Sequence, residues 1–235
     1  VEVSPPQESI QGTQWWTSYQ PVSYKLDSKL GTEAEFKNMI KQCNAVGVDI
    51  IADVVLNQTT GADVADGKQT GVAGTEYNGS TGDYSGFATE QYPEGITASD
   101  FHSCSKNISN YANQQEVQEC RLSSMWDFDS ESEKVQDIQS DYLAALWNAG
   151  VRGFRMDAVK HIHTDSMKAI KEKFAKKIGV NADSIYWIQE VIGNSSEAAG
   201  IQTSNYVQNG TVTEFGFKSE MNQTFKDKIA NLKGL

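Results

Sequence analysis

The chain has 235 residues, and 38% of them are hydrophobic, which is enough for an ordinary soluble core. Its formal net charge is −11 at pH 7 and its isoelectric point is near 4.7, so a neutral ligand or a cation suits it best. Nucleic acid and anionic membranes are excluded as partners because both would repel the chain, and no apolar run approaches the length of a membrane span.

The beginning of the chain predicts two strands with a helix between them. "VEVSP" at residues 1–5 has the pattern of a strand. The capping-box pair Thr32 and Glu35 predicts the start of a helix, and Gly47 predicts its end. The apolar run "VDIIADVVLN" at residues 48–57 follows directly and predicts a buried strand.

Residues 58 to 126 break this alternation. They are rich in Gly, Thr, Ser, Asn and Tyr and show no helical period. A structureless loop of this length is uncommon in a compact domain, so we expect a small irregular subdomain inserted after a strand. Cys104 and Cys120 lie in this stretch and could close a disulfide loop, and Cys43 would then be unpaired within this chain. The alternative is that all three cysteines are reduced thiols.

The remaining residues return to alternating helices and strands. The pair Ser130 and Glu133 predicts a second capping box, with Gly150 as the helix end, and a third helix is expected from about residue 166 to 178. The predicted strands are "VRGFRMDAV" (151–159), "IYWIQEVI" (185–192) and "TVTEFGF" (211–217), followed by a helix over 218–233. Near-continuous apolar strands alternating with amphipathic helices predict a parallel sheet covered by helices.

Polar side chains gather at the carboxyl ends of three predicted strands. In a parallel α/β barrel these ends meet on one face, where active sites are built. We therefore expect the following residues to lie together: Asp53, Asn57, Arg155, Asp157, Lys160, His161, Gln189 and Glu190.

The carboxylates Asp157 and Glu190 are expected to come from neighbouring strands. Paired carboxylates suggest glycoside hydrolysis, in which one acts as nucleophile and the other as general acid and base. Arg155 lies two residues before Asp157 and so shares its face of the strand, where its charge would keep the nucleophile ionised. A buried Arg–Asp ion pair without any reaction is the alternative.

The stretch "TQWWTSYQP" supplies aromatic side chains after the first strand. Trp15, Trp16 and Tyr19 could form flat apolar platforms for sugar rings, with Gln20 as a hydrogen-bonding partner. Adjacent tryptophans point in different directions, so packing in the core is an equally good interpretation of part of this cluster.

Five segments, in this order and spacing, resemble the α-amylase family of glycoside hydrolases of the animal and actinobacterial type: "VSPPQE", "WWTSYQPVSY", "DVVLNQ", "GFRMDAVKH" and "IQEVI". The resemblance implies a (β/α)₈ TIM-barrel catalytic domain, of which the chain holds about strands two to six. It implies barrel parts at residues 1–57 and 127–235, with an irregular domain B at residues 58–126 inserted after the third strand. Five of eight strands cannot close a barrel.

The resemblance also implies roles for individual residues. Asp157 matches the nucleophile, Glu190 the general acid and base, and Arg155 the arginine beside the nucleophile, which also binds chloride in chloride-dependent members. The matching substrate-binding residues are Trp15, Trp16, Tyr19, Gln20, Gln58, Lys160 and His161. Gln58 departs from the family, which usually has a histidine there; a glutamine can donate a hydrogen bond but cannot carry charge, so turnover could be lower.

A calcium site and a disulfide follow from the same resemblance. The implied calcium ligands are the side chains of Asn57 and Asp127 and the backbone carbonyls of Gln118 and His161, and such oxygen donors suit a hard cation. Cys104 and Cys120 match a disulfide of the inserted domain. Cys43 matches a helix cysteine whose usual partner lies before residue 1.

The function implied is endo-hydrolysis of α-1,4-glucosidic bonds in starch and glycogen with retention of configuration, by a secreted monomer whose partner is an α-glucan. The family's third acidic residue follows the seventh strand, which lies outside this chain, so the 235 residues alone are expected to be inactive. A related glucosidase or transglycosylase is one alternative, although "WWTSYQP" favours an amylase. A glucan-binding relative without catalysis is the other.

Overall fold

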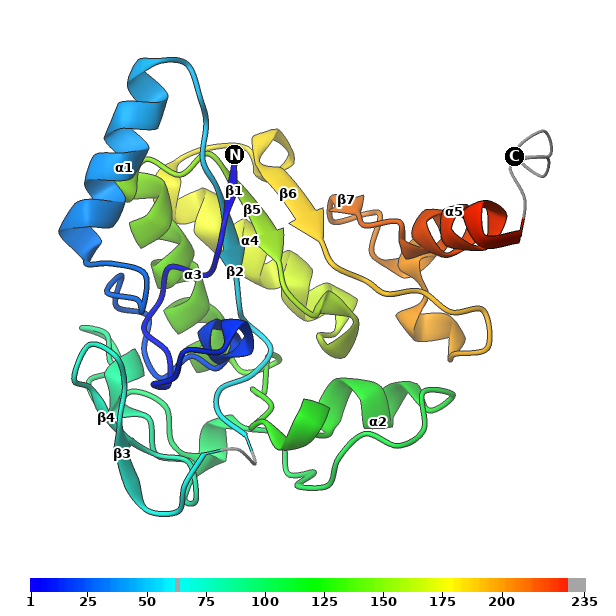
Figure 1. Cartoon of the computed structure of the whole chain (residues 1–235). Coiled ribbons are helices and arrows are strands. Elements are labelled where there is room, and N and C mark those ends of the chain that lie inside the picture. The colour runs from blue at the N-terminus through cyan, green and yellow to red at the C-terminus, as the bar shows by residue number, and fades with distance from the viewer. Residues whose placement is uncertain (62–63, 228–235) are drawn as a thin grey trace.

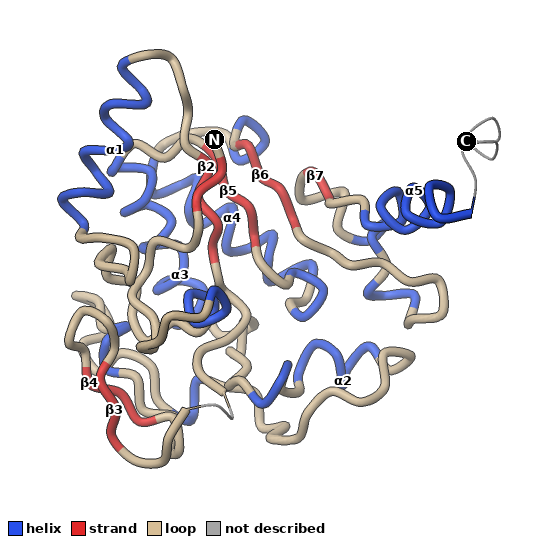
Figure 2. Tube along the Cα trace, in the orientation of Figure 1, coloured by secondary structure: helices blue, strands red, loops and turns tan. Residues whose placement is uncertain are grey.

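The computed structural model describes residues 1–61 and 64–227 and places a five-stranded, all-parallel sheet at its centre (Figures 1 and 2). The strand order is β1-β2-β5-β6-β7, so each new strand of this sheet is added beside the previous one. The strands are β1 (Glu2–Val3), β2 (Ile51–Val54), β5 (Gly153–Met156), β6 (Tyr186–Gln189) and β7 (Thr211–Val212). The alternation of apolar strands and helical patterns therefore predicted the sheet correctly.

Three helices cover one face of this sheet: α1 (Glu33–Ala45), α3 (Glu133–Ala149) and α4 (Thr164–Ile178) (Figure 1). They share a core with the strands because each helix turns one apolar stripe toward the sheet. The large, fully buried members of this core include Ile40, Leu143, Leu146, Phe154 and Phe174.

The strand register separates an apolar from a charged face. Phe154 and Met156 of β5 are both buried in the core beneath the helices, whereas Arg155 between them points to the other face. Asp53 of β2 is the register partner of Arg155, so the two side chains lie side by side on that other face.

The segment between β2 and α3 separates two parts of the parallel sheet along the chain. It contains the antiparallel pair β3 (Lys68–Thr70) and β4 (Glu76–Asn78) and the short helix α2 (Gln114–Glu119), which lie below the sheet in Figure 1. Its aromatic residues Tyr77, Tyr84, Phe87, Phe101 and Phe128 pack in a second core, which Ile10 and Val22 near the N-terminus and Val135 and Ile138 of α3 complete. The disulfide between Cys104 and Cys120 is present, and Cys43 is free.

The helix ends agree only in part with the sequence patterns. Thr32 and Glu35 form the predicted capping box, and Gly150 ends α3 in the left-handed conformation. The capping box predicted at Ser130 is wrong: the residue before α3 is Ser132, and no side chain caps it. A turn in which the N–H of Ser132 donates to the carbonyl of Asp129 precedes the helix and delays its start.

Three further boundaries differ from the prediction. The strand expected at 211–217 ends at Val212, because Glu214 accepts a hydrogen bond from the N–H of Gly216 and thereby starts helix α5 (Phe215–Asp227). Helix α4 begins at Thr164 rather than 166, and the last helix begins before 218, whereas residues 228–233 of that prediction lie outside the described residues.

Helix α2 was not predicted, although a signal for it exists. The Asn113 side chain accepts from the N–H of Glu116, so an N-cap residue with a glutamate three positions later marks its start. Six residues are too few to show a helical period. Among the described helices, none is long and apolar enough to cross a membrane.

Two helix-ending glycines provide a test of packing between α1 and α3. Gly150 and Gly179 both adopt positive φ, so alanine at either position costs about 1–2 kcal/mol of backbone strain. A Cβ at Gly150 would lie 2.7 Å from Cγ2 of Ile40, whereas nothing lies within 4 Å of one at Gly179. We expect Gly150→Ala to lower the free energy of unfolding in urea by about 1–3 kcal/mol more than Gly179→Ala. Equal losses would contradict this packing.

Candidate active site

Arg155 holds three carboxylates from three neighbouring strands or strand ends. Its Nη1 donates to Oδ1 of Asp53 at 2.7 Å and to Oδ1 of Asp157 at 2.8 Å, and its Nη2 lies 2.8 Å from Oε1 of Glu190. All four side chains are at most 18% exposed. One guanidinium therefore positions both carboxylates that the sequence predicted as catalytic.

Burial sets the protonation behaviour of this cluster. Burial raises the pKa of the Asp157 carboxyl to about 7; Arg155 opposes this shift, and the charge of Glu190 adds to it. Burial alone would lower the pKa of Arg155, but the charges of Asp53 and Asp157 outweigh burial and raise it. A single cation facing three carboxylates favours retention of one proton within the cluster.

The backbone and a neighbouring amide orient the two predicted catalytic carboxylates. The N–H of Ala158 donates to Oε2 of Glu190 at 3.0 Å, and Ala158 adopts a left-handed conformation directly after Asp157. Gln58 donates from Nε2 to the Tyr19 carbonyl at 3.2 Å and toward Oδ2 of Asp157 at 3.4 Å. The Oε1 atom of Gln58 is buried and has no hydrogen-bond partner within the protein.

Asp53 belongs to this cluster, although the sequence reasoning assigned it no role of its own. It is buried, it holds Arg155, and its Oδ2 accepts a 2.7 Å hydrogen bond from the Tyr19 hydroxyl. Burial raises its pKa, although Arg155 opposes that shift. The signal was a carboxylate inside an otherwise apolar strand, on the face that the strand register gives to Arg155.

These residues lie in a cleft of about 740 Å³, which is the size of an ordinary ligand site. Trp15, Trp16 and Tyr111 supply its aromatic wall, and Trp15 is 75% exposed. All predicted catalytic and substrate-binding residues line it: Trp15, Trp16, Tyr19, Gln20, Gln58, Arg155, Asp157, Lys160, His161 and Glu190. The sequence did not indicate the other lining residues, which are Tyr111, Leu122, Ser123, Met125, Ala158, Ile192 and Glu197.

Lys160 and His161 lie on a short 3₁₀ turn (Val159–His161) after β5. Lys160 donates to Oε2 of Glu197 at 2.6 Å, and its ammonium lies 5.3 Å from the centre of the Tyr111 ring. The Nδ1 atom of His161 donates to the carbonyl of Val117 at 2.9 Å, and burial lowers its pKa to about 4, so the imidazole is neutral near pH 7.

The predicted calcium ligands form two neighbouring pairs. Asn57 and Asp127 lie together, since the N–H of Phe128 donates to the carbonyl of Asn57 and both side chains are buried. Oδ1 of Asp127 has no hydrogen-bond partner, and burial raises its pKa to about 7 although His102 donates to its other oxygen. A buried carboxylate oxygen without a partner fits a bound cation.

Gln118 and His161 form the second pair of predicted calcium ligands. Helix α2 packs against the 3₁₀ turn after β5, and the Gln118 side chain donates to the Ile162 carbonyl at 3.4 Å. A cation held by the carbonyls of Gln118 and His161 would therefore join the inserted segment to the sheet.

Comparison with known proteins agrees with this arrangement. The family described as "Alpha amylase, catalytic domain" matches residues 15–233. An alpha-amylase from Streptomyces violaceus is 37% identical over 234 residues, covering 99% of this chain and 37% of that protein. An alpha-amylase from Aeromonas hydrophila is 40% identical over 237 residues, covering 100% of this chain and 48% of that protein.

The structural comparison gives the same result. Wild-type alpha-amylase I from Eisenia fetida matches with a TM-score of 0.85 and 34% identity, covering 97% of this chain and 46% of that chain. A mutant of alpha-amylase I from Eisenia fetida, described as a maltohexaose complex, matches with a TM-score of 0.83 and 34% identity, covering 94% of this chain and 45% of that chain. The chain belongs to the alpha-amylase family, and it spans less than half the length of these relatives, as part of the catalytic domain.

Replacement of Arg155 tests its role as the shared counter-charge. Arg155→Gln leaves three carboxylates without their cation, so we expect a loss of about 3–5 kcal/mol in the free energy of unfolding at pH 8. The loss should shrink at pH 5, because the carboxyl pKa values in the folded variant rise and protonation then relieves the repulsion. Lys41→Gln, which removes an exposed cation on α1, serves as control and should change stability little at either pH.

Proposed function

We propose that the natural protein containing this chain hydrolyses α-1,4-glucosidic bonds within starch and glycogen, with retention of configuration. The observation that carries this proposal is the pair Asp157 and Glu190, held by one guanidinium at the base of an aromatic-lined cleft. Retaining glycosidases need two carboxylates about 5–5.5 Å apart, and groups at the ends of adjacent parallel strands can reach that separation.

In the first step, a carboxylate oxygen of Asp157 attacks the anomeric carbon while Glu190 gives its proton to the departing glycosidic oxygen. The products are a glycosyl ester on Asp157 and a released glucan with a free hydroxyl. In the second step Glu190, now a carboxylate, takes a proton from a water molecule that attacks the same carbon, which frees Asp157. Arg155 supports both steps because it favours the ionised nucleophile and keeps the two groups in place.

The cleft suits a neutral glucan chain. Trp15 and Trp16 offer exposed rings, and apolar ring faces of sugars stack on such surfaces. The maltohexaose complex of the Eisenia fetida relative supports the same class of ligand for this site. An acidic chain with a net charge of −11 gains no attraction for anionic polymers, which also favours a neutral substrate.

Gln58 distinguishes this cleft from that of most family members. Its Nε2 is directed toward Oδ2 of Asp157, and its side chain lines the cleft. Because an amide does not titrate, Gln58 stays neutral across the working pH range and supplies no positive charge to the transition state. We infer slower turnover than with a histidine at this position.

Calcium and chloride are proposed as bound ions. Calcium would use Asn57, Asp127 and the carbonyls of Gln118 and His161 and would join the inserted segment to the strand ends. A chloride would have to approach Arg155 on a side that the three carboxylates leave open. Neither ion takes part in bond breaking in this scheme.

The proposal assigns the five parallel strands to barrel strands two to six, with residues 58–126 as the inserted domain B. The third acidic residue of the family's active site would then lie outside these residues, so activity belongs to the longer natural protein and the 235-residue chain alone would be inactive. We further propose a secreted monomer, which the Cys104–Cys120 disulfide supports.

Two alternatives make different predictions. A related glucosidase or transglycosylase would use the same carboxylates but would release single glucose units or new glycosidic bonds. A glucan-binding relative without catalysis would bind starch and cleave nothing. The shared Arg155 contact favours catalysis over binding alone, because a binding site gains little from three buried carboxylates.

Substitution of Glu190 distinguishes catalysis from glucan binding alone, and the products released by the unmodified protein distinguish an amylase from a glucosidase or transglycosylase. We expect Glu190→Gln in the natural protein to lower kcat on soluble starch by at least about 10³-fold, because an amide cannot donate the proton, while starch binding persists. Glu172→Gln, an exposed change on α4, is the matched control and should keep full activity. Starch binding without turnover in the unmodified protein would support the binding-only alternative and reject this proposal.

Calcium binding is testable without an activity assay. We expect calcium to raise the unfolding temperature of the chelator-treated protein, and Asn57→Ala to weaken calcium binding about tenfold or more, because one oxygen ligand is lost. Asn148→Ala changes an exposed asparagine on α3 and should leave calcium affinity unchanged. Equal calcium affinity in both variants would remove Asn57 from the site.

A further inference from the structure

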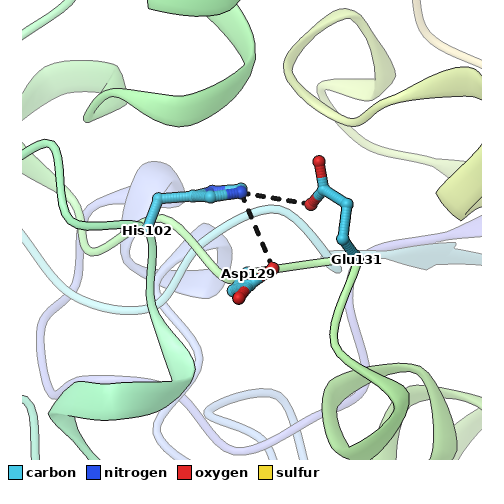
Figure 3. A group of neighbouring side chains, drawn as sticks. All are labelled: His102, Asp129 and Glu131. Carbon is cyan, nitrogen blue, oxygen red and sulfur yellow. Dashed lines mark hydrogen bonds and ion pairs between the residues drawn. The ribbon is translucent and has the colours of Figure 1, made fainter.

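A group of metal-binding side chains lies outside the cleft, at the junction between the inserted segment and α3 (Figure 3). Nε2 of His102 lies 3.1 Å from Oε2 of Glu131 and 3.8 Å from Oδ1 of Asp129. All three potential ligand atoms lie within 4.8 Å of one another. The His163 ring also reaches this group, with its Nε2 at 2.8 Å from the other oxygen of Glu131.

The backbone preorganises this group. The segment around Phe101 pairs antiparallel with the segment around Phe128, with hydrogen bonds from His102 N to Asp127 O and from Asp129 N to Asp100 O. Phe101 and Phe128 stack in the second core, with their ring centres 5.2 Å apart. Their neighbours in sequence must therefore point to the opposite side, where His102 lies directly across from Asp127 and diagonally from Asp129.

The second nitrogen of His102 has the partner typical of a metal ligand. Its Nδ1 donates to Oδ2 of the buried Asp127 at 2.7 Å, which fixes the ring and directs Nε2 toward Asp129 and Glu131. A carboxylate behind the imidazole is the usual outer partner of a metal-binding histidine, since it orients the ring and raises its basicity.

We propose that His102, Asp129 and Glu131 bind a zinc ion that joins the inserted segment to the start of α3. Tetrahedral zinc, with bonds of about 2.0–2.2 Å, requires ligand atoms about 3.3–3.5 Å apart. The two distances from His102 Nε2 are 3.1 and 3.8 Å, and all three ligand atoms lie within 4.8 Å, so small side-chain rotations of Asp129 and Glu131 would close the group around the ion. The imidazole nitrogen selects zinc over calcium, which prefers oxygen ligands alone. In the metal-free protein the carboxylates of Asp127 and Glu131 outweigh burial and raise the pKa of His102, so its Nε2 carries a proton. Zinc must displace this proton, after which two carboxylates and a neutral imidazole balance the charge of a dication.

The zinc site is distinct from the proposed calcium site, but Asp127 connects them. One oxygen of Asp127 is bonded to His102, and the other is the partner-free atom assigned to calcium. Zinc therefore stabilises the position of a calcium ligand and raises calcium affinity, and calcium raises zinc affinity by the same factor. This inference does not depend on hydrolytic activity.

Zinc titration of the natural protein, followed by calorimetry in saturating calcium, tests the site. We expect one zinc ion per chain, a rise in unfolding temperature, and zinc-edge X-ray absorption showing one imidazole nitrogen among oxygen ligands. Asp129→Asn and Glu131→Gln should each weaken zinc binding at least about tenfold. Glu133→Gln, an exposed change two residues further along the chain at the first position of α3, is the control and should bind zinc normally.

Several results would overturn the proposal. These are no zinc binding, zinc that excess calcium displaces one for one, or equal zinc affinity in wild type and both ligand variants. His102→Gln removes the contact to Asp127 as well as the proposed zinc ligand. Weaker zinc binding in this variant therefore supports the site only if Asp129→Asn and Glu131→Gln, which keep that contact, also bind zinc more weakly.

Discussion

The contact of Arg155 with three carboxylates is the interaction on which this site depends. It joins β2, β5 and the residue after β6 through side chains that parallel strands bring to the same face. Such a cluster is costly to bury and is stable only while the cation is present. The same arrangement that fixes two carboxylates for chemistry therefore also makes this part of the sheet sensitive to loss of one residue.

The inserted segment contributes to the site through the contacts that attach it to the sheet. The first attachment is the hydrogen bond between His102 and Asp127, shortly before α3. The second lies at α2, where Val117 and Gln118 contact the 3₁₀ turn after β5. Calcium at Asp127 and zinc at His102 would strengthen both attachments. Metal binding then affects the cleft through the position of its wall, without contacting the substrate.

Much of the fold and of the candidate site could be predicted from the sequence, because the informative patterns lie within short stretches of the chain. Apolar runs alternating with helical patterns predicted the parallel sheet, and the order and spacing of five motifs indicated the family, which in turn implied the cleft residues and the disulfide. Individual ion pairs between distant segments could not be predicted in this way. Asp53 and Arg155, 102 residues apart, were expected at the same end of the sheet, but only the strand register makes them direct partners.

The wrong helix start at Ser130 and the unpredicted His102 group also depend on backbone contacts that the sequence does not show. Ser130 matches a capping box, but a turn closed by Asp129 and Ser132 takes precedence, so the helix starts later. The residues of the His102 group come from two separate segments whose backbone pairing no sequence pattern announced.

The central claim is that Asp157 forms a covalent bond to the sugar while Glu190 acts as acid and base. The most direct measurement is mass spectrometry of peptides from the natural protein after reaction with a fluorinated maltosyl substrate that slows release of the glycosyl enzyme. This account predicts a sugar label on the peptide that contains Asp157, specifically on that residue. A label on Glu190, or turnover of starch without any labelled peptide, would contradict it.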